Sequence, residues 1–214
     1  MKIALITASI GGFDSIKEIP NQTIPYELIR VEEKDLIEIK GDARHKAKFP
    51  KMQTHLFTDA SIIIWIDGSV QVVSNTFVEY MVQQVQGNDI AIGKHNVRNC
   101  AYEEIDYCCA EIMKGNEYLK RRYDMDTLLD MKKYLKSVNF EENKGLYSCG
   151  IFVRKNNNVT NAMFDLWWKS EKLWQTNDQP MFVHLANQLK LKINIIEWKS
   201  IFSNEYFKLV NHNE

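Results

Sequence analysis

An aspartate follows the clearest strand signal in the chain. The run Ile62-Ile-Ile-Trp-Ile66 is β-branched and aromatic, which is typical of a strand buried on both faces, and Asp67-Gly68-Ser69 ends it abruptly. Ligands of open α/β sheets bind beyond the carboxyl ends of the strands, so a carboxylate here would lie in the binding crevice. Because Asp-Gly is also a common turn pair, the position of Asp67 alone leaves a purely structural role open.

The chemistry that favours a functional Asp67 is sugar transfer from a nucleoside diphosphate. The departing diphosphate develops negative charge, and a divalent cation held by carboxylate oxygens neutralises that charge. Enzymes with this arrangement normally carry Asp-x-Asp after such a strand, whereas this chain has Ser69 in the second position. We therefore predict a metal site of Asp67 and Ser69 completed from elsewhere, with His212 near the C-terminus as the candidate. The alternative for His212 is an unordered chain end that binds nothing.

A glycine pair follows the first apolar run, residues 2–9. Such glycines let the backbone approach a base or ribose closely, and the nearby Asp14 could accept hydrogen bonds from either. The spacing matches neither a dinucleotide fingerprint nor a P-loop, which argues against a nicotinamide cofactor and against ATP hydrolysis. The predicted donor-binding residues are Thr7, Ala8, Gly11, Gly12 and Asp14, together with Asp67, Gly68 and Ser69.

Two basic residues precede the Asp67 strand. Arg44 and Lys48 are four residues apart and would share one face of a helix, where they could counter a diphosphate or pair with Asp67. A solvated basic face is the alternative. We assign both residues to the donor side.

Polar residues are dense behind the short predicted strand 89–93. His95, Arg98, Glu103 and Glu104 provide the paired donors and acceptors that sugar hydroxyls need, although helix capping and solvation would explain half of them. We predict that His95, Arg98 and Glu103 bind the acceptor sugar.

The segment Asn177-Asp-Gln-Pro180 opens a predicted helix and carries the candidate catalytic residue. Asp178 could act as a base toward an acceptor hydroxyl or stabilise a cationic sugar, and an ordinary N-cap accounts for it equally well. Gln179 is assigned to the acceptor side. The tryptophans of Trp167-Trp168 are expected in the core.

The elements that must position these groups alternate along the chain. Strands are predicted at 2–9, 26–31, 61–66, 89–93, 146–154 and 192–197. Helices are predicted at 44–58, broken or kinked by Pro50, at 75–86, over most of 101–137 with an interruption near Gly115, from a cap at Thr160 to Trp174, and from 177–180 onward. This order predicts one α/β domain over 1–214, with a central, mainly parallel mixed sheet flanked by helices and a helical insertion at about 101–137.

Composition excludes several classes of protein. Of 214 residues 45% are hydrophobic, enough for a substantial core, and the net charge of −1 provides no field for nucleic acid or an anionic membrane. The four cysteines lack metal-site spacing and are expected to be reduced packing residues. The apolar run at the N-terminus is too short for the core of a signal peptide or for a membrane span. We therefore expect either a soluble cytoplasmic protein or a domain of a longer one.

Several short motifs, in this order, resemble a glycosyltransferase-like family once catalogued as a domain of unknown function, with plant cell-wall and mucilage, bacterial and viral members. The similar segments are Thr7 to Asp14, Arg44 to Pro50 with His55, Trp65-Ile-Asp-Gly68, His95 to Glu104, Gly145 to Arg154, and Leu166-Trp-Trp168 with Asp178-Gln179. The resemblance implies a GT-A-like fold, a UDP-sugar donor and Mn²⁺ or Mg²⁺ dependence, with Asp67 on the metal and Arg44 and Lys48 near the donor.

The predicted activity is transfer of a hexosyl or deoxyhexosyl group from a UDP-sugar to a hydroxyl of a glycan or glycoprotein. Retention of configuration is favoured, because no residue is an obvious base. The alternatives are a non-catalytic glycan-binding domain, which would need neither UDP nor metal, and a sugar-nucleotide nucleotidyltransferase, which would need a Gly-rich basic loop near the N-terminus.

Overall fold

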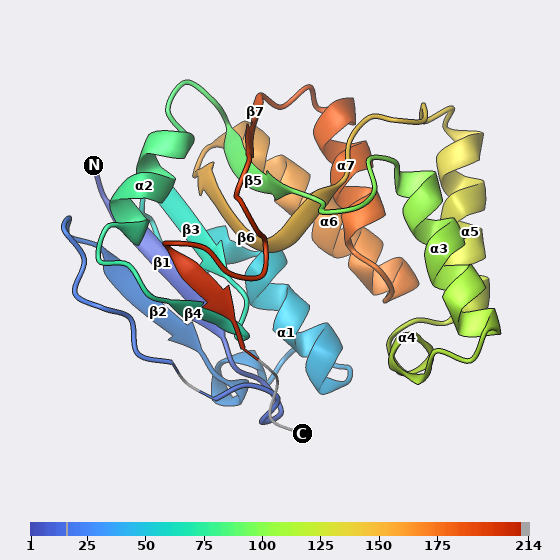
Figure 1. Cartoon of the computed structure of the whole chain (residues 1–214), viewed down its shortest axis with the longest axis horizontal. Coiled ribbons are helices and arrows are strands. Elements are labelled where there is room, and N and C mark those ends of the chain that lie inside the picture. The colour runs from blue at the N-terminus through green and yellow to red at the C-terminus, as the bar shows by residue number, and fades with distance from the viewer. Residues whose placement is uncertain (16, 211–214) are drawn as a thin grey trace.

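A six-stranded sheet forms the centre of the protein in the computed structural model, which describes residues 1–15 and 17–210. Its order is β2-β1-β3-β6-β5-β7 (Figure 1). The strands are β1 (Ile3–Ala8), β2 (Glu27–Val31), β3 (Ile62–Ile66), β5 (Ile90–Lys94), β6 (Tyr147–Lys155) and β7 (Ile193–Ile196). Only the two pairings of β6, with β3 and β5, are antiparallel among these described strands. The prediction of an α/β fold with a mainly parallel mixed sheet is confirmed.

Alternation along the strands sends side chains into two separate cores. In β3, Ile63 and Trp65 join a large core, whereas Ile62, Ile64 and Ile66 join a smaller one on the opposite face. Because successive side chains of a strand point to opposite faces, an apolar residue at every position requires cover on both faces. All five residues of β3 are buried accordingly.

Helices supply that cover. α1 (Ala43–Met52), α6 (Asn158–Trp174) and α7 (Gln179–Gln188) contribute to the large core, and α2 (Phe77–Gln84) contributes to the smaller one. α3 (Ala101–Met113), α4 (Glu117–Arg122) and α5 (Met125–Ser137) lie at the end of the molecule away from β2 (Figure 1). The expected interruption near Gly115 is present, and a second one separates α4 from α5. In the part of the chain that the structure describes, no helix is both long and apolar enough to cross a bilayer.

Two helix boundaries differ from the sequence-based predictions. The predicted helix 44–58 ends at Met52, two residues after Pro50, and a short 3₁₀ turn, Thr54–Leu56, follows. Thr160 is not the N-cap of α6. Asn157 holds that position and accepts from the Thr160 backbone N–H at 3.0 Å, while the Thr160 hydroxyl accepts from the Asn157 N–H at 3.3 Å. This reciprocal capping box starts the helix earlier than a single Thr cap would.

The C-terminal segment contains a strand that the sequence pattern did not predict. β8 (Phe207–Leu209) pairs antiparallel with β4 (Val70–Val72), which begins just after Ser69. Beyond this strand, the Val210 N–H donates to the Ser69 carbonyl at 2.9 Å. The last described residues therefore lie next to the turn that follows β3.

A buried arginine connects the segments on the large-core face. The guanidinium of Arg154, at the end of β6, donates to the hydroxyls of Thr54 and Thr160 and to Asn161, and it stacks 4.4 Å from the Phe164 ring centroid. Burial lowers its pKa to about 9. The resemblance motif that ends at Arg154 therefore has a structural role, joining the turn after α1 to α6.

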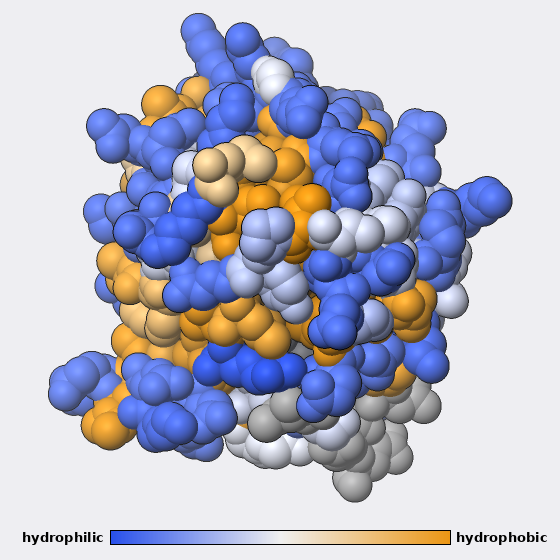
Figure 2. Space-filling view, turned by 90° about the vertical axis from the view of Figure 1, so that its left-hand side faces the viewer, coloured by the Kyte–Doolittle hydropathy of each residue, from blue (hydrophilic) through white to orange (hydrophobic). Residues whose placement is uncertain are grey.

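β2 forms one edge of the sheet. Figure 2 shows the side of the molecule that lies on the left in Figure 1, where hydrophilic residues surround an apolar area. Glu27 and Arg30 place charges on this strand. Charged side chains on an edge strand oppose pairing with another chain.

Candidate active site

Asp67 lies at the carboxyl end of β3, as predicted. Its backbone N–H donates to the Gly150 carbonyl at 2.8 Å, and its carbonyl accepts from Val70 at 2.9 Å, which closes the turn. The indole N–H of Trp65 donates to Oδ1 at 2.7 Å. The side chain keeps 38% of its surface exposed. One carboxylate oxygen is thus fixed by the protein, while the group as a whole stays accessible from the crevice.

Lys51 links Asp67 to Asp178. Its ammonium lies 2.9 Å from Asp178 Oδ2 and 3.7 Å from Asp67 Oδ1, and only 10% of its side chain is exposed. Burial opposes the charge on Lys51, but the two carboxylates outweigh burial and raise its pKa. Burial likewise opposes ionisation of Asp178, yet Lys51 and Lys48 lower the Asp178 pKa below its ordinary value. Asp178 is therefore held as a carboxylate.

Asp67 is in a different electrostatic state from Asp178. Burial raises its pKa, Lys51 and the Trp65 hydrogen bond lower it in part, and the charges of Asp178 and Asp14 raise it again. An added cation would relieve this excess of negative charge. A bound metal ion would therefore favour the ionised form of Asp67, at the carboxyl end of β3.

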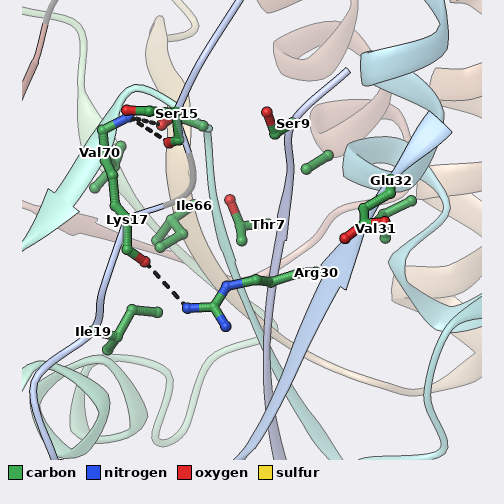
Figure 3. Close-up of a pocket in the computed structure, with 12 residues that line it drawn as sticks. Thr7, Ser9, Ser15, Lys17, Ile19, Arg30, Val31, Glu32, Ile66 and Val70 are labelled. Carbon is green, nitrogen blue, oxygen red and sulfur yellow. Dashed lines mark hydrogen bonds between the residues drawn. The ribbon is translucent and has the colours of Figure 1, made fainter. Parts of the chain in front are cut away.

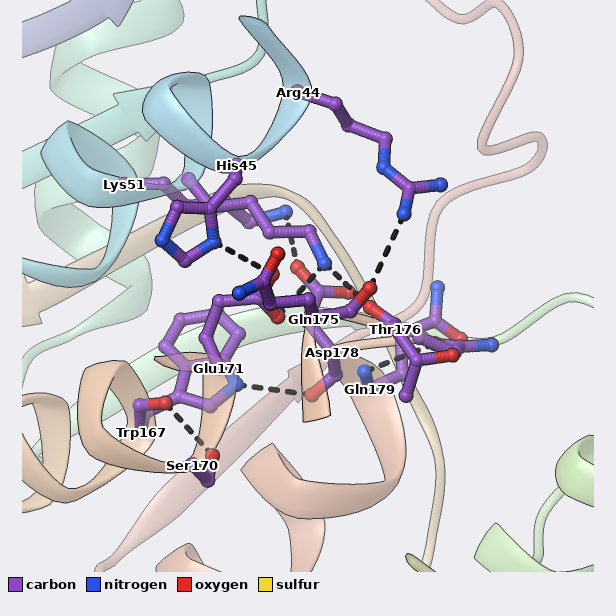
Figure 4. Close-up of polar contacts among 12 residues, drawn as sticks. Arg44, His45, Lys51, Trp167, Ser170, Glu171, Gln175, Thr176, Asp178 and Gln179 are labelled. Atoms are coloured by element: carbon purple, nitrogen blue, oxygen red, sulfur yellow. Dashed lines mark hydrogen bonds and ion pairs between the residues drawn. The ribbon is translucent and has the colours of Figure 1, made fainter. Parts of the chain in front are cut away.

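Three basic residues of α1 bind the loop between α6 and α7. Arg44, Lys48 and Lys51 are spaced i, i+4, i+7 and therefore share one helix face. Arg44 donates to the Gln175 carbonyl at 3.2 Å, Lys48 donates to the Thr176 carbonyl, and Lys51 pairs with Asp178 (Figure 4).

The sequence allowed Arg44 and Lys48 to pair with Asp67, but both residues contact other groups. Lys51 contacts Asp67 instead, and sequence reasoning missed it. Its i+7 spacing from Arg44 was the available signal. Lys48 also pairs with the buried Glu171 at 2.8 Å, an interaction that fixes α1 against the end of α6.

Asp178 occupies the N-cap position of α7 but does not cap it. Its carboxylate makes no capping hydrogen bond, and the Gln179 N–H donates instead to Asn177 Oδ1 at 3.1 Å. The Asp178 carbonyl accepts from the Trp167 indole at 2.9 Å, which holds the backbone in place (Figure 4). Pro180 lies in the first turn, as predicted. Freed from capping, the carboxylate of Asp178 turns to Lys51.

A narrow cleft opens beside Gly68, between β1, β2 and the segment after β1 (Figure 3). Of the predicted donor-binding residues, Thr7, Ala8 and Gly68 line it. Sequence reasoning missed three charged residues that also line it, Lys17, Arg30 and Glu32. The Lys17 ammonium donates to the Gly68 carbonyl at 2.6 Å, and the Lys17 carbonyl accepts from Arg30 at 3.2 Å. These contacts close one wall of the cleft.

Gly11, Gly12 and Asp14 lie near this cleft but do not line it. The two glycines have φ of 67° and 71°, in the left-handed region, so they shape the turn after β1. Asp14 packs against Gly68: a Cβ at residue 68 would lie 2.6 Å from Asp14 Oδ2. Only glycine at residue 68 lets the Asp14 carboxylate approach the Asp67 turn so closely.

Two of the residues predicted for the acceptor side, His95 and Arg98, belong to a largely buried network around Glu104. Glu104 accepts from Arg98 and from Asn177 Nδ2, the latter at 2.9 Å, and lies 3.8 Å from His95 Nε2. Glu103 is exposed on the other side of α3. Asn177 therefore joins this network to Asp178, its neighbour in the chain, and Glu104 rather than Glu103 is the acidic member. Buried Oε1 of Gln179 has no hydrogen-bond partner among the described residues.

The donor set at the Asp67 turn suits a hard divalent cation only in part. The carboxylates of Asp67 and Asp14 and the hydroxyl of Ser69 are oxygen ligands of the kind that Mg²⁺ and Mn²⁺ prefer. Within residues 1–15 and 17–210, however, no group of three or more His, Cys, Asp or Glu side chains could hold a metal ion. His212, the predicted further ligand, lies outside the described residues. Val210 is the last described residue, and its contact with Ser69 brings the chain to this turn.

Comparison with known proteins gives a match over most of the chain. The family described as TOD1/MUCI70, glycosyltransferase-like domain, matches residues 26–213, a range that contains Lys51, Asp67 and Asp178. No curated protein matches the sequence.

Several solved structures are similar to this chain over most of its length, at low identity. Mouse xyloside xylosyltransferase 1 is 8% identical, with a TM-score of 0.43 over 91% of this chain and 84% of that one. The Mn/GDP form of core-mannan synthase A from Aspergillus fumigatus is 6% identical, with a TM-score of 0.41 over 87% and 69%. A197 from STIV is 10% identical, with a TM-score of 0.39 over 92% and 82%.

Proposed function

The chain belongs to the TOD1/MUCI70 glycosyltransferase-like family, and on that premise we propose that it is a metal-dependent glycosyltransferase. It moves a hexosyl or deoxyhexosyl group from a UDP-sugar to a hydroxyl of a glycan or glycoprotein. The observation that carries the proposal is the pair of unlike carboxylates joined by Lys51. An added cation would stabilise the charge on Asp67, whereas Asp178 is already paired with Lys51 and stays ionised.

The residues divide into a donor side and an acceptor side. Thr7, Ala8 and Gly68, which line the cleft, contact part of the nucleoside, and the charged groups of Lys17 and Arg30 at the same cleft suit an anionic ligand. Asp67 and Ser69, with His212 from the C-terminal tail, hold Mn²⁺ or Mg²⁺. When bound, the ion neutralises the charge on the departing diphosphate. Asp14, adjacent to Gly68, adds negative potential that strengthens cation binding.

Asp178 stabilises positive charge on the sugar rather than removing a proton. Its pKa is lowered by Lys51 and Lys48, and a carboxylate with a lowered pKa is a weak base. The same ionised group favours a sugar with oxocarbenium character. With Asp178 a weak base, the departing diphosphate accepts the proton of the attacking hydroxyl. Attack from the face that the diphosphate leaves gives retention of configuration.

UDP binding with and without metal tests this function. In the presence of Mn²⁺, UDP at about 100 times its own dissociation constant should stabilise the protein by about 2.7 kcal/mol. This stabilisation should raise Tm by roughly 5–10 °C. UDP alone should give much less. A screen of UDP-sugars, monitored by UDP release, then identifies the donor. A glycan-binding domain without catalysis would show neither the metal-dependent shift nor UDP release.

His212→Ala tests the third ligand. We expect Mn²⁺ to bind about tenfold or more weakly, because one of few protein ligands is lost, while UDP-dependent stabilisation at saturating Mn²⁺ is largely restored. The measurement is a Mn²⁺ titration of the UDP-induced Tm shift. Asn211→Ala, one residue away, is the control and should leave the titration unchanged. Equal Mn²⁺ affinity in wild type and His212→Ala would remove His212 from the site.

A further inference from the structure

Tyr123 connects α4 to α5 next to the α6–α7 loop. Its backbone N–H donates to Leu119 at 2.8 Å, which ends α4, and Asp124 then caps α5 by accepting from Thr127 at 2.9 Å. Both neighbouring helices therefore fix the backbone at this position. The Tyr123 ring is partly buried and packs against the large core. A side chain held in this way has little conformational freedom left to lose when it binds a ligand.

Arg44 holds Tyr123 against the Asp178 loop. Its guanidinium carbon lies 5.5 Å from the centroid of the Tyr123 ring, and the same guanidinium donates to the carbonyls of Arg122 and Gln175. One side chain of α1 therefore binds the helical insertion and the loop that carries Asp178 at the same time. This contact explains the role of Arg44 better than a contact with the donor does.

The Tyr123 hydroxyl makes no hydrogen bond within the described part of the chain, although the ring is partly buried. Burial raises the pKa of the phenol, and the charge on Asp178 raises it further, so the group remains a protonated donor at neutral pH. The buried Oε1 of Gln179, next to Asp178, is an acceptor that also lacks a partner among the described residues. A phenol donor and an amide acceptor are both groups that pair with sugar hydroxyls.

We propose that Tyr123 is an acceptor-binding residue whose hydroxyl donates a hydrogen bond to the acceptor sugar beside Asp178. The inference rests on the proposed function and assigns α3–α5 a part in it. In this assignment Tyr123, between α4 and α5, is part of the acceptor wall of the active site. The ligand is a glycoside with free hydroxyls, one of which accepts from the Tyr123 phenol.

The chain offers a matched pair of variants for the test. Tyr123→Phe removes only the hydroxyl and keeps the ring that Arg44 holds. Tyr118→Phe is the control, since Tyr118 also belongs to the insertion and is also stacked on an arginine, Arg122, at 4.5 Å, but it is 51% exposed. The probes are methyl α- and β-glycosides of glucose, galactose, mannose and xylose, each added with UDP and Mn²⁺ in a thermal-shift assay. UDP-sugar turnover with and without the same glycosides gives the kinetic readout.

Tyr123→Phe should weaken binding of the stabilising glycoside about 5- to 10-fold and raise the acceptor KM by the same factor. The effect should fall on the acceptor KM and not on the donor KM, and Tyr118→Phe should behave as wild type. An unchanged acceptor KM, an equal change in Tyr118→Phe, a parallel change in donor KM, or the absence of any glycoside effect on wild type would overturn the inference. If wild type showed no Tm shift with UDP and Mn²⁺, the proposed function itself would be refuted instead.

Discussion

Asp67→Asn should abolish metal-dependent UDP binding and lower the rate of transfer by about 10²–10³ or more, because the leaving diphosphate loses its charge stabilisation. Asparagine keeps the shape of the side chain and can still accept from the Trp65 indole, so the end of β3 should remain folded. It lacks the negative charge that binds a cation. The measurements are UDP release from the best donor and the Mn²⁺-dependent Tm shift with UDP.

Asp59→Asn is the matched control for this prediction. Asp59 precedes β3 in the chain, its side chain is 82% exposed, and its ion pair is with Lys2. Exposed pairs contribute little to stability, so this variant should retain wild-type activity and Tm. Asp67→Asn with a normal UDP and Mn²⁺ shift would refute the metal site, and an equal loss of activity in Asp59→Asn would point to a general effect of charge.

Lys51→Met should lower Tm by about 10 °C and inactivate the enzyme. The substitution leaves Asp178 and Asp67 without their shared cation, and removing one partner of a buried pair costs about 3–5 kcal/mol. Methionine preserves most of the aliphatic volume, so the loss arises from charge rather than from a cavity. Differential scanning calorimetry measures the change. Lys132→Met removes a lysine from the surface pair with Asp106 and should shift Tm by no more than about 2–4 °C.

A second variant separates charge from packing at Lys51. Lys51→Met/Asp178→Asn removes the buried carboxylate together with its cation and should recover part of the lost Tm, because no unpaired charge remains at residue 178. Activity should stay absent, since the ionised Asp178 is lost. A double variant as unstable as Lys51→Met would show that the unpaired carboxylate of Asp178 is not the cause of the lost stability.

The effect of Asp178 on the pH dependence of stability should have opposite signs in wild type and in Lys51→Met. In wild type the lowered pKa of Asp178 adds stability above the unfolded value of about 4, and this stability is lost as pH falls through the folded pKa. In Lys51→Met only the charge of Lys48 still opposes burial, so the Asp178 pKa rises and protonation at lower pH stabilises the folded state. The Tm difference between the two proteins should therefore narrow from pH 8 to pH 5. A constant difference would contradict the charge assignment.

Much of the fold follows from local patterns in the sequence. Continuous apolar runs predicted the central strands, and their alternation with helical segments predicted a mainly parallel sheet, because buried strands and amphipathic helices differ in period. The misplaced boundaries arose where competing contacts decided the outcome. β4 and β8 are three residues each and exist because they pair with each other. Strands this short carry too little pattern to detect in isolation.

The position of Asp67 was determined by the sequence itself, since an acid directly after a buried strand must lie at the edge of the sheet. Its partners were decided only by the tertiary structure. Lys51 and Asp178 are 127 residues apart, and no local pattern reports that α1 packs against the α6–α7 loop. The sequence likewise does not distinguish Glu103 from Glu104. The way α3 packs against the rest of the protein buries Glu104 and leaves Glu103 exposed. Residue type and local spacing thus fixed which chemistry is available, whereas packing fixed which charges meet, because electrostatic pairing depends on distance in space.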